Sequence, residues 1–388
     1  MRFSSRLPSS LEPNGLTRLL AERRDRGLEI LDLTASNPTR CGFSYPEESI
    51  RAALGGAQAL AYDPDPRGRK DARAAVAAWW GHGLTEKDLV LSASTSESYS
   101  WLFKLLGDPG DDLLVPSPSY PLFEWLARME GLVARQIPAF GFEGWQLDLA
   151  GLESACGPRT RAVVVVNPNN PTGHFLSRTD WERLAALCAR KGLVLVVDEV
   201  FSPYPLEPTE DAVQTVLEDT SPPCPTVVLS GLSKAALLPQ LKLAWTAVRG
   251  PGAERLLEGL EFIADQYLSV SAATLAALPE LLRLAPDLQA QCLARLRINL
   301  AALDRLLTSA STWSRLGVGG GWSVVLRRPA LSTDGEFVES LLSRRGVLVH
   351  PGEFFGFAAE GHLIASLLTD PVIFANGAAR MLEFDPQV

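Results

Sequence analysis

The sequence predicts an α/β protein with two parts: a large domain with a mainly parallel β-sheet flanked by helices, and a smaller α+β domain formed by both chain ends. Between residues 87 and 250, apolar runs rich in valine and leucine alternate with stretches of helical periodicity. This alternation is typical of parallel sheets that are covered on both faces. In addition, a chain of 388 residues is longer than one hydrophobic core usually serves.

Six short apolar runs are the predicted strands of the large domain. They lie at residues 87–93, 111–117, 161–167, 192–200, 226–232 and 242–250. Patterns of helical periodicity separate several of them, for example TDWERLAALCARKG between the third and the fourth run. Because the runs are short and nearly uninterrupted, we expect strands that are buried in a sheet.

The remaining segments are expected to form the smaller domain. A helical stretch at 279–310, interrupted near Pro286, follows the predicted strands. The segments GVGGGWSVVLRR, FVESLLSRRGVLVHPG and GHLIASLLTD then lead to a final helix. We therefore expect residues 46–289 to form the large domain, and residues 1–45 and 290–388 to form the smaller one.

Composition excludes several classes of protein. A net charge of −9 argues against a nucleic-acid partner, which requires a basic face. No apolar run approaches the about 20 residues that span a bilayer, and the first residues lack the apolar core of a secretory signal. The five cysteines are scattered without a CxxC pair, and the four histidines have no metal-ligand spacing. We expect a cytoplasmic protein without membrane contact, disulfides or metal.

Polar residues gather where the predicted strands end. They are Ser94 to Ser96, Ser117 to Tyr120, Asn167 to Gly173, Asp198, and Ser230 to Lys234. In an open parallel sheet, ligands bind outside the carboxyl ends of the strands. One ligand that contacts all five groups is a simpler explanation than five unrelated turns.

Lys234 lies in the apolar stretch SGLSKAALLPQLKLAW. A buried ammonium is costly, and a lysine in apolar surroundings tends to lose its proton. Either the side chain reaches water along the apolar surface, or the site uses a neutral amine.

The motifs NPNNPTG (167–173), DEV (198–200), SK (233–234) and PG (351–352) resemble those of the fold-type I pyridoxal-phosphate aminotransferases of class I/II. The spacing between Asp198 and Lys234 is also similar to that of the family. The resemblance covers nearly the whole chain, from LDLTASNPT to EGHLIASLL. It implies that the cofactor is pyridoxal 5'-phosphate.

The resemblance implies four catalytic residues. Lys234 would form the Schiff base with the cofactor and later act as general base. Asp198 would keep the pyridine nitrogen protonated, so that the ring accepts electrons from the substrate carbon. Asn170 would donate a hydrogen bond to the ring hydroxyl oxygen, and Tyr120 would stack on the ring. Without the resemblance, Asp198 and Asn170 could equally be ordinary turn residues, and Tyr120 a core tyrosine.

The cofactor phosphate is expected to bind hydroxyls, backbone amides and a cation. Thr95 and Ser96 at a predicted helix start offer amides, although they could simply cap the helix. Ser230 or Ser233 would add a hydroxyl, with a weak preference for Ser233. Lys242 would supply the cation.

Tyr62 resembles the tyrosine that reaches the phosphate of the partner subunit in this family. The resemblance therefore implies a homodimer with shared active sites. The alternative is a tyrosine of an ordinary surface turn.

Four positions depart from the family pattern. Phe201 replaces a common tyrosine, so the Schiff base should keep its proton to higher pH. Gly231 replaces a phosphate-binding serine, and Lys242 replaces an arginine that binds phosphate with a bidentate geometry. Ile364 occupies the usual place of the arginine that pairs with the substrate α-carboxylate. Arg40 is a candidate replacement, although a lone loop arginine is more often a solvated charge.

We therefore predict an aminotransferase that moves an amino group between an amino donor and a 2-oxo acid by a ping-pong mechanism. A carbon–sulfur lyase, or another α,β-eliminating enzyme, is the alternative with the same cofactor. Transamination leaves a pyridoxamine form after one half-reaction, whereas elimination restores the starting form and releases ammonia. A binding protein that has lost catalysis is the third hypothesis, opposed by the presence of Lys234, Asp198 and Asn170.

Overall fold

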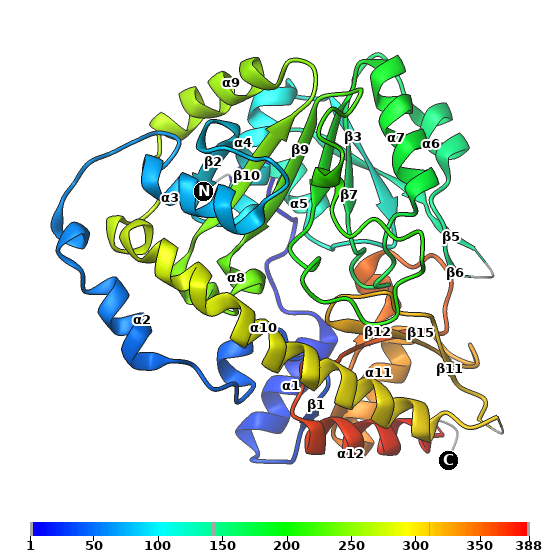
Figure 1. Cartoon of the computed structure of the whole chain (residues 1–388). Helices are drawn as coiled ribbons and strands as arrows, with labels where there is room; N and C mark the ends of the chain where they lie inside the picture. Colours follow the sequence, from blue (N-terminus) through cyan, green and yellow to red (C-terminus); the bar gives the residue numbers. More distant parts are fainter. Residues whose placement is uncertain (1–2, 142–143, 310, 386–388) are drawn as a thin grey trace.

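A seven-stranded sheet forms the centre of the molecule (Figure 1). The computed structural model describes residues 3–141, 144–309 and 311–385. The strand order is β2–β10–β9–β8–β7–β3–β4, and only β10 runs antiparallel to its neighbours. The strands are β2 (Leu89–Ser92), β3 (Asp112–Ser117), β4 (Val133–Pro138), β7 (Thr160–Val166), β8 (Val194–Asp198), β9 (Thr226–Gly231) and β10 (Ala244–Arg249). The six predicted strands are present, and the mainly parallel sheet is confirmed.

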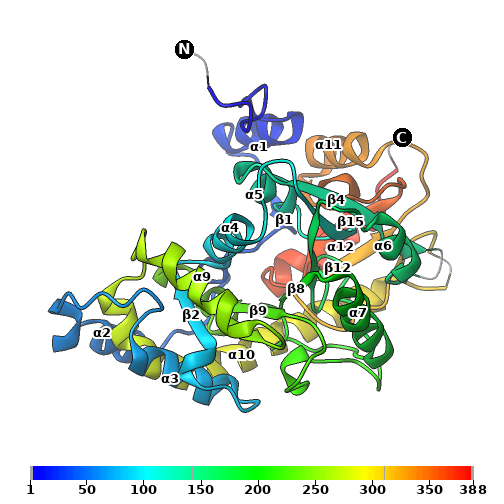
Figure 2. The same cartoon turned by 90° about the horizontal axis from the view of Figure 1, so that it is seen from above.

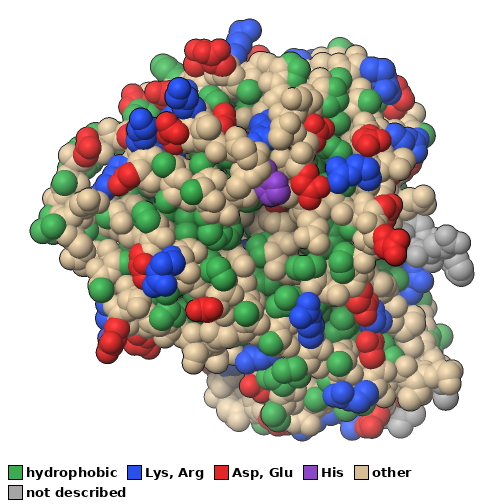
Figure 3. All heavy atoms as spheres, in the orientation of Figure 1, with side chains coloured by type: hydrophobic (Ala, Val, Ile, Leu, Met, Phe, Trp, Pro, Cys, Tyr) green, Lys and Arg blue, Asp and Glu red, His purple; other side chains and the backbone are tan. Residues whose placement is uncertain are grey.

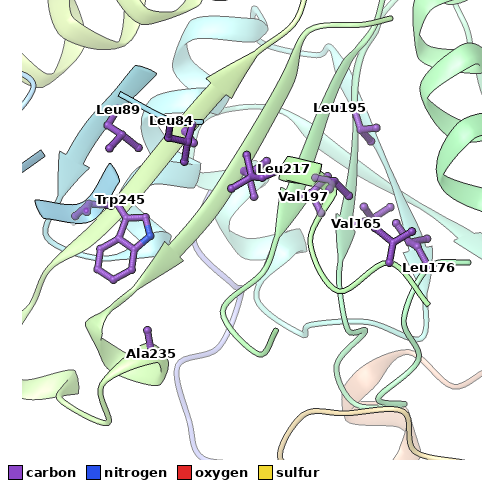
Figure 4. Close-up of a cluster of buried hydrophobic side chains, with 14 of the residues drawn as sticks. Leu84, Leu89, Val165, Leu176, Leu195, Val197, Leu217, Ala235 and Trp245 are labelled. Carbon is purple, nitrogen blue, oxygen red and sulfur yellow. The ribbon is translucent and has the colours of Figure 1, made fainter. Parts of the chain in front are cut away.

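Helices cover both faces of this sheet (Figure 2). One face carries α3 (Lys70–Trp80), α6 (Leu149–Ala155), α7 (Arg178–Lys191) and the first part of α10 (Ala272–Leu306). The other carries α4 (Thr95–Leu106), α5 (Phe123–Met129) and α9 (Ala253–Asp265). Along β7, Val163 and Val165 join the first hydrophobic cluster, while Ala162, Val164 and Val166 join the second. Figure 4 shows side chains of the first cluster on neighbouring strands. Burial on both faces explains why the strands read as continuous apolar runs.

The long helix α10 differs from its predicted form. It runs without interruption through 35 residues, although Pro279 and Pro286 lie inside it. Proline removes one backbone hydrogen bond and ordinarily bends or ends a helix. Here Leu278 to Ala285 pack against the central sheet, and Leu288 to Leu303 pack into another cluster. This tertiary burial on both sides of Pro286 offsets the lost bond.

Both chain ends share a further hydrophobic cluster. It joins α1 (Gly15–Asp25), α11 (Asp334–Arg345), α12 (Pro371–Leu382) and a four-stranded sheet of order β11–β12–β15–β14. These strands are β11 (Ser314–Arg315), β12 (Ser323–Arg327), β14 (His350–Pro351) and β15 (His362–Ser366). β1 (Leu31–Asp32) pairs in parallel with β13 (Val347–Leu348), which ties the first segment of the chain to the last. Because α10 belongs to both parts, the domain limits at 45/46 and 289/290 stay a prediction.

Short elements complete the structure. They are α2 (Glu47–Leu54), α8 (Leu232–Ala235), the pair β5 (Phe140–Gly141) and β6 (Gly144–Trp145), and 3₁₀ turns at Pro38–Arg40, Ala57–Leu60, Glu86–Asp88, Val216–Glu218, Pro239–Leu241 and Gly352–Phe355. In the face seen in Figure 3, charged side chains of both signs are scattered over the surface. Across the described ranges, no helix is long and apolar enough to cross a membrane. Those same residues contain no cluster of metal-ligating side chains.

Candidate active site

A cavity of about 470 Å³ opens at the carboxyl edge of the central sheet. Its size lies within the usual range of cofactor and ligand sites. Eight of the predicted site residues line it: Thr95, Ser96, Tyr120, Asn170, Asp198, Ser233, Lys234 and Lys242. Seven of them follow or end parallel strands. Lys242 reaches the same edge because β10 runs in the opposite direction and therefore begins there.

Lys234 lies in α8, directly after β9. Its side chain is half-buried, and burial lowers the pKa of its amine. The Nζ atom lies 4.8 Å from the ring centroid of Trp322 and 5.8 Å from that of Phe201. Within the described ranges it has no ion-pair partner, and its backbone carbonyl accepts a 2.5 Å hydrogen bond from the Tyr204 hydroxyl. The structure thus holds the backbone of Lys234 in place, and burial lowers the pKa of the amine that lines the cavity.

Asp198 is the buried carboxylate of the site. Its Oδ2 accepts a 2.9 Å hydrogen bond from the Tyr99 hydroxyl, and its Oδ1 accepts a 3.0 Å bond from the Val200 amide. Burial raises the pKa of this carboxyl to about 6, and the two donors and the charge of Lys234 oppose the rise. Asp198 is therefore mostly ionised at neutral pH. The sequence interpretation missed Tyr99; its signal is a phenol among the buried positions of α4, which needs a hydrogen-bond partner.

Asn170 belongs to a loop that two other asparagines hold in place. Asn167 Nδ2 donates to the Val213 carbonyl at 2.8 Å, and Asn169 Nδ2 donates to Thr172 Oγ1 at 2.9 Å. The carboxamide of Asn170, by contrast, makes no hydrogen bond with the described part of the chain and lines the cavity. It is free to bind a ligand.

Tyr120 presents an aromatic ring to the same cavity. The ring packs edge-to-face against Phe123, with centroids 5.5 Å apart. Burial raises the pKa of the Tyr120 phenol, so the side chain stays neutral at physiological pH. A neutral ring held by a neighbouring ring is suited to stacking against a planar ligand.

The start of α4 borders the cavity with groups that are suited to an anion. The Ser94 hydroxyl accepts a 3.2 Å hydrogen bond from the Glu97 amide and so caps the helix. The backbone N–H groups of Thr95 and Ser96 have no partner among the described residues, and both residues line the cavity. With Lys242 on the same lining, this helix terminus offers free amides, hydroxyls and a positive charge.

Three predicted residues lie outside the lining. Ser230 is buried within β9, whereas Ser233 lines the cavity. Arg40 ends an exposed 3₁₀ turn. Tyr62 is 82% exposed and borders a separate cavity. These three assignments stay predictions.

Gly231 has a steric reason to be glycine. A Cβ atom added at this position would lie 2.9 Å from the Cβ of Ala244 on the adjacent strand β10. Serine would therefore force the two strands apart, and any phosphate-binding hydroxyl of this segment must come from another residue.

One family model matches most of the chain. The model of the family "Aminotransferase class I and II" matches residues 29–371. The chain belongs to this family. It is an aminotransferase, as the resemblance of its motifs predicts.

Several relatives are named as aminotransferases, but they are distant from this chain in sequence. The chain is 28% identical over 369 residues to an alanine aminotransferase of Mycobacterium tuberculosis, covering 87% of this chain and 81% of the relative. It is 27% identical over 358 residues to the arginine–pyruvate transaminase AruH of Pseudomonas aeruginosa, covering 89% and 87%. The relatives differ in the donors that their names state, so identity at this level leaves the donor of this aminotransferase open.

Solved structures agree with the fold. An aspartate aminotransferase double mutant of Thermus thermophilus superposes with a TM-score of 0.84 at 25% identity, covering 98% of this chain and 99% of that one. An alanine aminotransferase of Pyrococcus furiosus gives a TM-score of 0.85 at 24% identity, covering 99% of each chain.

The site fits the cofactor on which this family generally depends, pyridoxal phosphate. An amine of lowered pKa, a carboxylate, an unpartnered carboxamide and an aromatic ring surround one cavity, with an anion-binding helix start at its side. These groups match an aldehyde, a ring nitrogen, a ring hydroxyl, an aromatic face and a phosphate, respectively.

The rest of the lining is mainly apolar and was largely missed by the sequence interpretation. It includes Phe201, Trp322, Ser323, His350, Phe355 and Ile364. Trp322 packs edge-to-face against Phe201, with centroids 5.5 Å apart. Of these six residues, Phe201 and Ile364 were recognised beforehand, through their departure from the family pattern. Trp322 and His350 carry no local signal that separates them from ordinary core residues.

Proposed function

We propose that this aminotransferase binds pyridoxal 5'-phosphate covalently through Lys234 and moves an amino group between an amino donor and an oxo acid by a ping-pong mechanism. The observation that carries the proposal is the convergence of Lys234, Asp198 and Asn170 on one cavity from three separate strand ends. Lys234 is half-buried and has no ion-pair partner in the described ranges, yet it shares a cavity with a buried carboxylate. An ordinary turn after a strand does not require this arrangement. A reactive amine next to an electron-accepting ring does require it.

When bound, the cofactor supplies an aldehyde that carries the amino group and a ring that accepts electrons. Lys234 provides the amine, and its lowered pKa keeps Nζ ready to take a proton from the substrate carbon and to return it. Asp198, ionised at neutral pH, would hold the ring nitrogen of the cofactor in its protonated form. Asn170 would donate a hydrogen bond to the ring hydroxyl oxygen, and Tyr120 would stack on the ring.

The start of α4 would hold the phosphate of the cofactor. The free amides of Thr95 and Ser96, the hydroxyl of Ser233 and the ammonium of Lys242 would supply its donors. A lysine is a point charge rather than a bidentate fork, so backbone amides contribute most of the orientation. The position of Ser233 on the lining supports this residue over Ser230.

We further propose a homodimer in which Tyr62 reaches the phosphate of the partner subunit. Its 82% exposed side chain supports a contact outside its own chain, as does the neighbouring Leu60, which is 92% exposed. The five cysteines are all unpaired, which supports a reducing, cytoplasmic environment.

The experiment is chemical trapping of the cofactor. Borohydride reduction of the holoprotein should fix one cofactor per chain on the peptide that contains Lys234, measured by mass spectrometry after digestion. Lys234→Ala should lose this adduct and all transamination. Lys191→Ala is the matched control, because this exposed lysine ends α7 at the opposite edge of the sheet. Labelling of Lys234→Ala at an undiminished level would refute the covalent role of Lys234.

A further inference from the structure

Beyond the proposed cofactor site, the described lining of the cavity has no charged side chain at neutral pH; it combines apolar side chains with His350 and with the hydroxyls of Thr34, Ser36, Ser323 and Ser366. Ile364 lies in β15 between Val325 of β12 and His350 of β14, and it is 2% exposed. It packs in a cluster with Leu316, Val325 and Phe357. A substrate group that contacts Ile364 and this cluster therefore meets hydrocarbon.

Within one subunit, the charged groups of the lining already have a role in the proposed function. The lysine side chains that line the cavity are Lys234 and Lys242, and no arginine lines it in the described ranges. If the proposed function holds, Lys234 carries the cofactor and Lys242 faces its phosphate. The lining carboxylate is Asp198, whose negative charge repels a second carboxylate. Burial lowers the pKa of His350, which therefore adds no positive charge at neutral pH.

We propose that Ile364 determines specificity, so that the preferred substrates carry hydrogen or an uncharged group instead of a carboxylate on the reacting carbon. The donors are then primary amines, which become aldehydes or ketones while the acceptor carbonyl becomes an amine. The preference extends to the acceptor, because both substrates occupy the cavity in turn. Among oxo acids, the enzyme should prefer those in which the carboxyl group is not attached directly to the reacting carbonyl carbon. This inference rests on the proposed function and narrows its substrate class.

The physical reason is the cost of a buried, unpaired charge. A carboxylate held against Ile364 would lose its hydration without gaining a charged partner in the same chain, which weakens its binding. Aromatic and aliphatic side chains in the same cluster gain from contact with an apolar group. The cavity therefore disfavours a carboxylate at this position and favours an apolar group.

The test compares two donors that differ only in the carboxylate: 2-phenylethylamine and L-phenylalanine. Conversion of the cofactor from its pyridoxal to its pyridoxamine form is followed by absorbance in single turnovers. We expect the amine to react with a kcat/KM about a hundredfold higher. Faster reaction of L-phenylalanine would overturn the inference and leave the proposed function intact. Conversion by neither donor, nor by any member of a wider panel of amines and amino acids, would instead refute the proposed function.

Ile364→Arg tests the residue itself. The variant should raise the kcat/KM for L-phenylalanine and lower that for 2-phenylethylamine, whereas Ile364→Leu should keep the preference for the amine. A folded Ile364→Arg protein with the unchanged preference would overturn the role of Ile364. If the arginine variant does not fold, the comparison of donors in the unaltered enzyme decides.

Equilibrium binding gives a readout independent of turnover. By calorimetry, the holoenzyme should bind 3-phenylpropanamide about tenfold more tightly than 3-phenylpropanoate, and Ile364→Arg should reverse this order. Tighter binding of the carboxylate by the unaltered enzyme would contradict the inference. Loss of that tighter binding in Arg40→Ala would then identify Arg40 as the carboxylate partner.

Discussion

The Tyr99–Asp198 pair is the residue-scale feature on which the chemistry of the site depends. A carboxylate buried at the end of β8 would lose its charge near neutral pH without donors. The hydroxyl of Tyr99, delivered from α4, donates to it at 2.9 Å and opposes the effect of burial. Tyr99 is thus a positioning residue that keeps Asp198 ionised and fixed.

Tyr99→Phe should move the pH dependence of cofactor binding to higher pH. The hydrogen bond stabilises the ionised carboxylate, so its removal raises the pKa of Asp198 further above about 6. As pH falls, Asp198 takes up a proton and the affinity for pyridoxal phosphate should decline. In the variant, this decline should begin at a pH about 1 unit higher. Fluorescence titration of the apoprotein between pH 5 and 8 measures the shift.

Tyr267→Phe is the control for this substitution, because the Tyr267 side chain is 50% exposed and packs against Trp101. Its pH profile should match that of the unaltered protein. An unshifted profile in Tyr99→Phe would show that Asp198 does not depend on this donor.

At the scale of elements, α4 joins a structural cap to the proposed phosphate site. Ser94 accepts from the Glu97 amide, which leaves the amides of Thr95 and Ser96 directed at the cavity edge. Ser177 caps α7 in the same way, accepting from the Asp180 amide at 2.9 Å, but it is absent from the cavity lining. A comparison of these two caps therefore distinguishes the effect of a cap on stability from its effect on ligand binding.

Ser94→Ala and Ser177→Ala should each lower the free energy of unfolding by about 1 kcal/mol, measured by urea denaturation of the apoprotein. Only Ser94→Ala should also weaken binding of pyridoxal phosphate, by about two- to fivefold, because it loosens the helix start that holds the phosphate. Equal loss of affinity in both variants would argue against the phosphate site at α4.

At the scale of the whole molecule, the proposed dimer can be tested by mixing subunits. Lys234→Ala and Tyr62→Ala homodimers should both be impaired. In a mixed dimer, one site combines Lys234 from one chain with Tyr62 from the other, so it should be intact. Mixing under conditions that exchange subunits should therefore restore activity, measured against the unmixed variants.

The mixture of Lys234→Ala with Asp198→Ala is the control, because these two residues line one cavity within one chain. No combination of such subunits rebuilds a complete site, so activity should stay low. If the Tyr62 mixture also stays inactive while sedimentation confirms mixed dimers, Tyr62 does not complete the partner's site.

Sequence patterns identify elements best where burial is complete. The six buried strands were predicted because most of their side chains are apolar and buried on both faces of the sheet. β4 was missed, since most of its side chains are exposed and its sequence VARQIP contains no apolar run. The break near Pro286 was predicted from local propensity, which tertiary packing on both sides of α10 overrides.

The sequence by itself determined the fold class, the family, and the set of polar residues at the strand ends, because alternating burial and motif spacing are local properties of the chain. Only the tertiary structure decided which of these residues share one cavity. It brought Lys242 to the carboxyl edge by reversing β10, and it placed Tyr99 against Asp198. It also set Ile364 among apolar side chains. These relations depend on the order and direction of strands distant in sequence, which no local pattern encodes.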